Sequence, residues 1–141
     1  MSDPSQVPEG FRRVQRPRLN PFNELVGPFY ECRRGEEVSL GLRIEERHTN
    51  SRGICHGGLL ATMADLALGY AMLSIARQSG FVTVNLSLDF AGSARAGDWV
   101  ESAVEVQKTG ARLAFANCYL VANDLRIVRA SAIFALSGTP K

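Results

Sequence analysis

The stretch GGLLATMADLALGYAMLSI, from Gly57 to Ile75, decides the fold because it predicts one long apolar helix. Asp65 is the only charged side chain within it. At about 100° per residue, mostly small residues share the Asp65 side of this helix, and bulkier ones lie opposite. The Asp65 side comprises Gly58, Ala61, Thr62, Gly69, Met72 and Ala76, and the opposite side comprises Leu60, Met63, Ala67 and Tyr70. We therefore expect the bulky side to pack on the chain's own sheet and the Asp65 side to face a substrate or a second subunit.

Alternating apolar residues before and after this helix predict β-strands. Val38, Leu40, Leu42 and Ile44 alternate with polar or small residues within 37–46. The helix is expected to end near Gln78, and four more strands are expected at 81–90, 99–108, 112–122 and 125–136. A short helix at 21–26 and a short strand at 29–33 complete the expected elements. One long helix and a meander of long antiparallel strands indicate an α+β fold in which the sheet curves around the helix.

The composition is that of one globular domain. The chain has 141 residues and a formal net charge of +2, which is too small to indicate nucleic acid as a partner. Residues 1–20 are rich in polar residues and arginine, so we expect a flexible arm there and a single domain over 21–141.

We expect no secretion signal and no membrane partner, because the longest apolar run is interrupted by Asp65 and is expected to fall short of a membrane span. Three cysteines without metal-type spacing fit reduced thiols in the cytoplasm.

The residues that open the long helix suggest acyl chemistry. His56, Gly57 and Gly58 stand at its start, where free backbone N–H groups favour developing negative charge. A carboxylate in an apolar helix must be paired or used, because burying an unpaired charge costs several kcal/mol. Gly57 and Asp65 are about 12 Å apart along the helix axis, too far for one helix to bring both groups to one carbonyl carbon. We therefore expect a symmetric dimer in which the helix start of one subunit faces Asp65 of the other.

Three segments carry a resemblance to a known family. They are HTNSRGICHGG at 48–58, with Asp65 nine positions after His56, TVNLSLDF at 83–90 and ARAGD at 94–98. Together they resemble the hot-dog-fold acyl-CoA thioesterases, in particular the PaaI-like (phenylacetate-degradation) branch of the 4-hydroxybenzoyl-CoA thioesterase superfamily. The resemblance covers the chain from about Glu37 to Phe134. It implies a hot-dog fold, a long antiparallel sheet wrapped around one central helix, assembled as a dimer or a dimer of dimers.

The resemblance also implies roles for individual residues. Asp65 would be the catalytic carboxylate, as general base or nucleophile, and the Gly57 N–H would polarise the thioester carbonyl. Asn50 and His56 would orient substrate or water beside Gly58, and Thr83 would support the site near Asp65. The implied substrate is an acyl-CoA, so coenzyme A enters as part of the substrate and no separate cofactor is expected. The two histidines are too few and too poorly accompanied to predict a metal site.

Other interpretations of the same residues stay open. Gly57 and Gly58 could serve only a tight turn, Asn50 only a loop and Thr83 only a strand. Hydratases and dehydratases of the same fold, or a non-catalytic acyl-CoA-binding protein, are alternative functions. Relatives commonly carry a basic residue directly after the glycine at Gly110, whereas here the charge is one position later, on Arg112. A role for Arg112 in binding the CoA phosphates is therefore not expected, and the acyl group is not identified.

Overall fold

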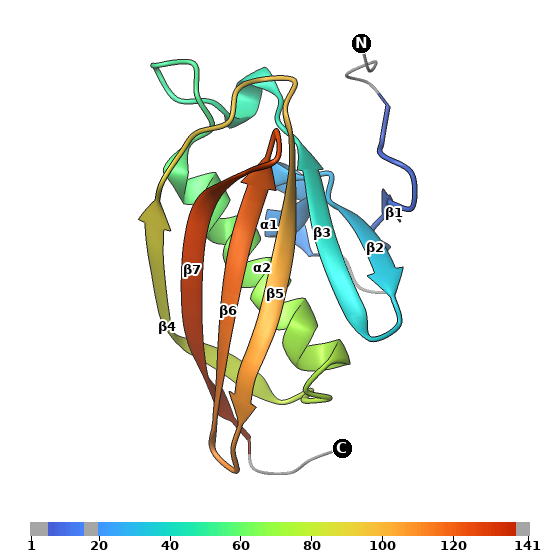
Figure 1. Cartoon of the computed structure of the whole chain (residues 1–141), viewed down its shortest axis with the longest axis vertical. Helices are drawn as coiled ribbons and strands as arrows, with labels where there is room; N and C mark the ends of the chain where they lie inside the picture. The colour runs from blue at the N-terminus through green and yellow to red at the C-terminus, as the bar shows by residue number, and fades with distance from the viewer. Residues whose placement is uncertain (1–5, 16–19, 138–141) are drawn as a thin grey trace.

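The computed structural model of the chain describes residues 6–15 and 20–137, in which one seven-stranded antiparallel sheet curves around the long helix α2 (Figure 1). The strands lie in the order β1-β2-β3-β5-β6-β7-β4, which puts β4 at one edge of the sheet. The strands are β1 (Arg12–Arg13), β2 (Tyr30–Arg34), β3 (Glu37–Arg43), β4 (Phe81–Phe90), β5 (Trp99–Thr109), β6 (Leu113–Ala122) and β7 (Leu125–Leu136). The helices are α1 (Pro21–Val26), the 3₁₀ turn η1 (Glu46–His48) and α2 (Gly57–Ser74). The expected α+β hot-dog architecture is confirmed.

The main difference from the expected elements is the end of α2. The helix ends at Ser74 and not near Gln78. Arg77 has a φ of +55°, a left-handed conformation that no α-helix continues through, and the N–H of Gln78 reaches back to the carbonyl oxygen of Met72 at 2.8 Å. Backbone geometry after the last turn therefore stops the helix, although the apolar sequence itself runs on to Ile75 and Ala76.

The bulky side of α2 forms the core, as expected, with Leu60, Met63 and Ala67 buried against the sheet. Met72, expected on the Asp65 side, is fully buried instead. Near that level of the helix β4 begins alongside it, and a Cβ at Gly69 would lie 3.8 Å from the Phe81 ring. Strand β4 thus covers the Asp65 side of α2 along the second half of the helix. Nearer Asp65 the same side is open.

Part of the expected N-terminal arm is attached to the domain. Strand β1 pairs with β2, with Arg12 opposite Glu31, and the N–H of Val14 donates to the carbonyl oxygen of Phe29 at 2.9 Å. The Phe11 ring meets Trp99 edge to face, with the centroids 5.2 Å apart. Residues 11–14 are therefore held against the domain by a strand pairing, a backbone hydrogen bond and a ring contact, whereas a flexible arm was expected there. The remaining arginines of the expected arm, Arg16 and Arg18, lie outside the described residues.

The length of α2 also corrects an expectation. Among the described residues it is the one helix long and apolar enough, by length and composition alone, to cross a membrane, whereas the sequence predicted that this run falls short. The core helix of a folded domain has the same composition, and 44% of this helix is buried inside its own domain.

His48 links the end of α1 to the loop that leads to α2. Its Nδ1 accepts a hydrogen bond from the N–H of Glu45 at 2.9 Å, and its Nε2 donates to the carbonyl oxygen of Val26 at 2.7 Å. The imidazole is buried, and burial is the main cause that lowers its pKa below the ordinary value. The neutral ring satisfies both contacts, because a proton on Nδ1 would face the Glu45 N–H.

We expect His48 to make stability depend on pH. The unfolded chain binds a proton near pH 6.5, above the folded-state pKa, so the free energy of unfolding should fall as the pH drops from about 6.5 to 5. Denaturant titrations across that window measure the slope. His48→Gln should flatten this slope. Equal slopes for wild type and His48→Gln would contradict this assignment.

Candidate active site

Asp65 and Thr83 are brought together by a direct hydrogen bond. The Thr83 hydroxyl donates to Asp65 Oδ1 at 2.9 Å, linking the middle of α2 to the start of β4. Strict alternation along residues 81–90 predicts that Thr83 shares a strand face with Asn85, and this prediction is wrong. The pairing of β4 with β7 shifts register between Thr83 and Asn85, so Val84 is an extra residue that interrupts the alternation. Thr83 therefore faces the helix.

The carboxylate of Asp65 is held at one oxygen and open at the other. Oδ1 accepts from Thr83, and Oδ2 has no hydrogen-bond partner in the described part of the chain. Asp65 is partly exposed in the single chain and not fully buried. A carboxylate fixed in this way presents a free oxygen that can accept a proton or attack an electrophile.

The start of α2 is capped by a histidine side chain. Nδ1 of His56 accepts from the N–H of Gly58 at 2.8 Å, so neutral His56 carries its proton on Nε2, where it can donate. A Cβ at Gly58 would lie only 2.9 Å from that Nδ1, which explains the glycine there. The Gly57 N–H, by contrast, has no acceptor among the described residues. An unpaired N–H at a helix start can stabilise developing negative charge.

The loop before α2 is folded tightly around Asn50. Its side-chain oxygen accepts from the N–H of Arg52 at 2.9 Å and of Ile54 at 3.4 Å, and its own N–H donates to the carbonyl oxygen of Ile54 at 2.8 Å. Asn50 is thus a loop-forming residue, and its amide nitrogen still lacks an acceptor in the described part of the chain. The Asn50 oxygen and backbone N–H stabilise the loop, and the amide nitrogen is left to contact a substrate.

The expected site residues form two groups in one chain. Asp65 and Thr83 make the first, and Asn50, His56 and Gly57 make the second. Gly57 and Asp65 are the first and ninth residues of α2, about 12 Å apart along its axis. The single chain therefore does not assemble both groups around one carbonyl carbon.

Two other candidates have structural roles or lie elsewhere. Cys55 is 3% exposed, and burial raises the pKa of its thiol to about 11, so it is a core side chain and not a candidate nucleophile. Arg112 lies in the bend just before β6 and not in a strand. No group of three or more His, Cys, Asp or Glu side chains that could hold a metal is found among the described residues.

Sequence reasoning missed the contact between Phe90 and the helix start. A Cβ at Gly57 would lie 3.4 Å from the Phe90 ring, so the last residue of β4 flanks the unpaired N–H. Alternation along residues 81–90 predicts that Phe90 shares an apolar strand face with Leu86 and Leu88. It carried no signal for which turn of α2 that face would meet, because the register between helix and strand is set by tertiary packing.

Comparisons with known proteins agree with this geometry. Residues 52–128 match the thioesterase superfamily. A putative esterase of Pseudomonas aeruginosa is 46% identical over 133 residues, covering 92% of this chain and 97% of that protein. Mouse acyl-coenzyme A thioesterase 13 is 32% identical over 82 residues, 58% of this chain and 59% of that protein.

Solved structures share the fold. Zebrafish thioesterase superfamily member 2 superposes with a TM-score of 0.77 at 26% identity, covering 84% of this chain and 88% of that one. The E. coli PaaI protein superposes with a TM-score of 0.68 at 21% identity, over 73% of this chain and 74% of that one, and supports the fold alone. The predicted resemblance is confirmed, and the chain is a hydrolase that belongs to the thioesterase superfamily.

Proposed function

We propose that the protein hydrolyses acyl-CoA thioesters to the free acid and coenzyme A, with Asp65 as general base or nucleophile and the Gly57 N–H as oxyanion donor. The observation that carries the proposal is the Asp65 carboxylate, oriented by Thr83 at 2.9 Å with its second oxygen free. Mouse acyl-coenzyme A thioesterase 13, a relative over 58% of this chain, supports the substrate class. His56 and Asn50 would orient substrate or water beside Gly57 and Gly58.

The proposed site is shared between two chains of a homodimer. Pairing Gly57 with Asp65 of the partner subunit about a two-fold axis makes the two α2 helices antiparallel and centres their contact near Ala61, midway between the two positions. Gly58 and Thr62, also small, allow a close approach there. Edge strand β4 adjoins this face and exposes Val82 by 63% and Val84 by 54%, which favours burial against a second copy. Two dimers could join into a tetramer.

Further features of the proposal follow from composition. Coenzyme A is substrate and not a bound cofactor, and no metal is required for attack by a carboxylate or an activated water. A net charge of +2 gives no reason to expect nucleic acid, and we propose no membrane partner. Cys32, Cys55 and Cys118 are free thiols, as in proteins of the reducing cytoplasm, where we place the enzyme.

Replacing the Asp65 carboxylate tests the reaction. Asp65→Asn should lower turnover at least about a hundredfold, because the amide can neither accept the proton nor attack. Release of free thiol from phenylacetyl-, hydroxybenzoyl- and short to long aliphatic acyl-CoA measures hydrolysis and separates it from hydration or simple binding. Asp124→Asn makes the same change in an exposed turn and should leave turnover unchanged. Near wild-type hydrolysis by folded Asp65→Asn would remove Asp65 from the mechanism.

Thr83 should affect turnover more than stability. Thr83→Val keeps the shape and removes the hydrogen bond to Asp65, so we expect kcat to fall about tenfold or more, in line with hydrogen bonds to charged groups. Thr83→Ser keeps the hydroxyl and should retain most of the activity. Steady-state kinetics and thermal melts of both variants give the comparison. Equal activity of the Val and Ser variants would mean that Thr83 only fills space.

Complementation tests the division of the site between chains. Asp65→Asn should be mixed with a second inactive variant, Asn50→Ala combined with His56→Ala. Each heterodimer would contain one intact and one doubly damaged site and should recover up to about half of the wild-type activity. Mass spectrometry must show that subunits exchange. Exchange without recovery would mean that each chain builds its own site.

A further inference from the structure

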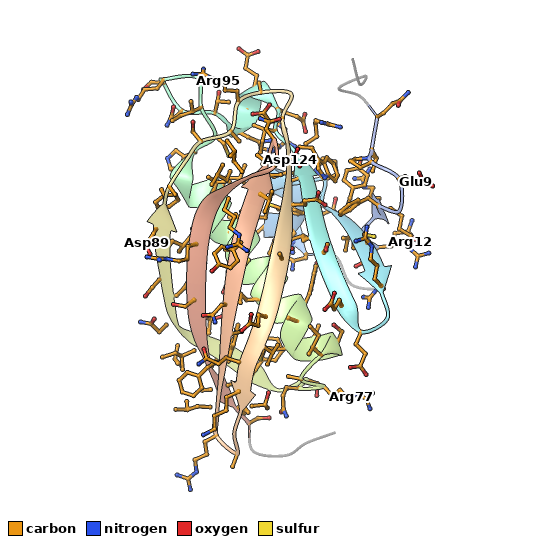
Figure 2. All side chains as sticks on the ribbon, in the orientation of Figure 1. Glu9, Arg12, Arg77, Asp89, Arg95 and Asp124 are labelled. Carbon is orange, nitrogen blue, oxygen red and sulfur yellow. The ribbon has the colours of Figure 1, made fainter. Side chains whose placement is uncertain are left out.

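Phe90 puts an aromatic ring beside the start of α2. It is the last residue of β4, and it is 55% exposed. A Cβ at Gly57 would lie 3.4 Å from two ring atoms, Cε1 and Cζ, so the far end of the ring meets the first residue of the helix. Asp89, the residue before it, points to the opposite face of the sheet and pairs there with Arg129 at 2.8 Å (Figure 2).

The ring lies on the same side of Gly57 as the unpaired N–H. Every Cα–Cβ bond of an α-helix tilts towards the helix start, and the first N–H groups point the same way. The position of the missing Cβ is therefore between the ring and the approach to the N–H. A carbonyl oxygen that accepts from this N–H has the ring as a near neighbour.

Packing within the chain does not explain the glycine at position 57. A Cβ there would make an ordinary van der Waals contact with Phe90, and the backbone is helical. Gly58 differs, because a Cβ there would come within 2.9 Å of His56 Nδ1. The fold therefore tolerates alanine at position 57, and glycine leaves the ring side of the N–H open to an approaching group.

The surroundings of this N–H divide into a polar and an apolar side. Residues 50–52 of the preceding loop are polar. On β4, Leu88 and Phe90 pair with the buried residues Ala130 and Val128, so both side chains are on the helix side of the sheet. A hydrocarbon chain attached to the bound carbonyl loses contact with water by lying along β4. Its first carbon then rests against the Phe90 ring.

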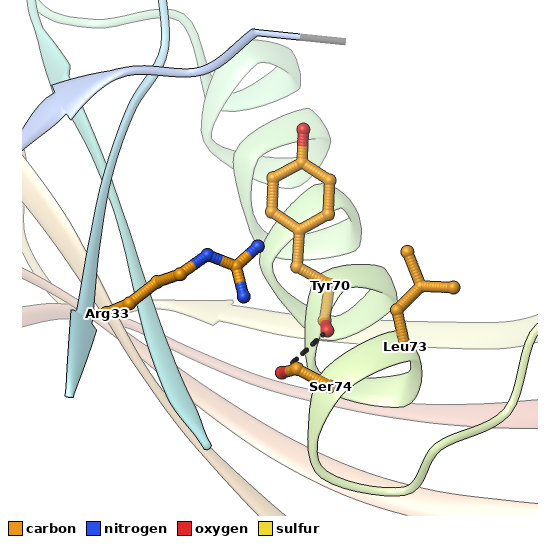
Figure 3. A pocket seen from close by; sticks show the side chains of 4 residues that line it. All are labelled: Arg33, Tyr70, Leu73 and Ser74. Carbon is orange, nitrogen blue, oxygen red and sulfur yellow. Dashed lines mark hydrogen bonds between the residues drawn. The ribbon is translucent and has the colours of Figure 1, made fainter. Parts of the chain in front are cut away.

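A pocket elsewhere on α2 is too far away to hold this carbon. Its volume is about 290 Å³, and it is lined by Arg33, Tyr70, Leu73 and Ser74 (Figure 3). Three of these residues are in the last turns of α2, and Leu73 is about 24 Å from Gly57 along the helix axis.

We propose that Phe90 is a specificity-determining residue, whose ring limits the bulk of the acyl group on the carbon next to the thioester carbonyl. The inference rests on the proposed thioesterase function and names the acyl groups that the site accepts, those unbranched at that carbon. An unbranched CH₂ group fits against the ring while the carbonyl oxygen stays on the Gly57 N–H. An additional methyl group would press on a ring already in contact with the helix start, and would displace the oxygen from its donor.

A pair of isomeric substrates tests this limit. Butanoyl-CoA and 2-methylpropanoyl-CoA have the same atoms, and only the second is branched next to the carbonyl. The wild type should prefer butanoyl-CoA by kcat/KM. Phe90→Ala should lower this preference about tenfold, and Phe90→Leu should lie in between. A purely structural loss would slow both substrates and leave their ratio unchanged.

The matched control removes a ring from the other face of the sheet. Phe115 lies between the buried residues Ala114 and Ala116 on β6, so its side chain faces away from α2. Phe115→Ala should keep the wild-type ratio. Light scattering and thermal melts of each variant report its assembly and stability.

Gly57→Ala tests the position of the ring independently. The variant keeps the N–H, and its melting temperature should be unchanged or higher, because alanine is favoured over glycine in a helix. The added methyl group covers the ring side of the N–H, so kcat/KM should fall about tenfold or more for both substrates. Full activity would overturn the placement of the acyl group beside Phe90.

The remaining outcomes separate this inference from the proposed function. A wild-type ratio near one, or an unchanged ratio in Phe90→Ala, would overturn the role of Phe90 while hydrolysis itself stands. An equal change in Phe115→Ala would overturn it too, because loosening of the domain would then explain the effect. Dissociation of Phe90→Ala into single chains would do the same, since the ring would then be a subunit contact. A wild-type enzyme that hydrolyses neither thioester, nor any other acyl-CoA, would instead refute the proposed function.

Discussion

The packing of α2 against one curved sheet is the constraint on which the rest of the structure depends. The helix buries Leu59, Leu60, Met63, Ala64, Ala67, Leu68, Ala71 and Met72. Each fully buried leucine or methionine contributes about 1.5–3 kcal/mol, so rotation of the helix about its axis would cost far more than any single polar contact provides. The same packing fixes the direction of the side of α2 that the sheet leaves uncovered. Asp65 lies at the flank of that side next to β4, where Thr83 donates to it.

Local structural features then orient individual side chains and N–H groups relative to the packed helix and sheet. The bulge at Val84 turns Thr83 towards Asp65, and the His56 side chain occupies the Gly58 N–H while the Gly57 N–H stays unpaired. The tight loop around Asn50 holds the residues that precede the helix. Each of these features depends on one or two hydrogen bonds, which contribute about 1 kcal/mol each. They therefore set the orientation of the site residues without determining the fold.

The helix α2 keeps its two candidate reactive groups apart along its axis. Its first residue offers an unpaired N–H at the positive end of the helix, and Asp65 follows eight residues later. One chain cannot bring these two groups together, because a helix keeps its residues about 1.5 Å apart along the axis. Two antiparallel copies would bring the positive end of one helix beside the carboxylate of the other. A straight helix is therefore compatible with the proposed shared site without any movement of the chain.

The sequence by itself determined the element types and the groups with reactive potential. Strict alternation in β3 and a lone charge in an apolar helix are local patterns, and residues 81–90 and 125–136 form strands at the predicted bounds. Only tertiary structure decided which face Thr83 takes, that Met72 is buried, that Phe11 packs on Trp99 and that Arg33 approaches Leu73. A bulge, a covered flank and a strand-to-helix contact depend on residues distant in the chain, and periodicity within one segment carries no information about such partners.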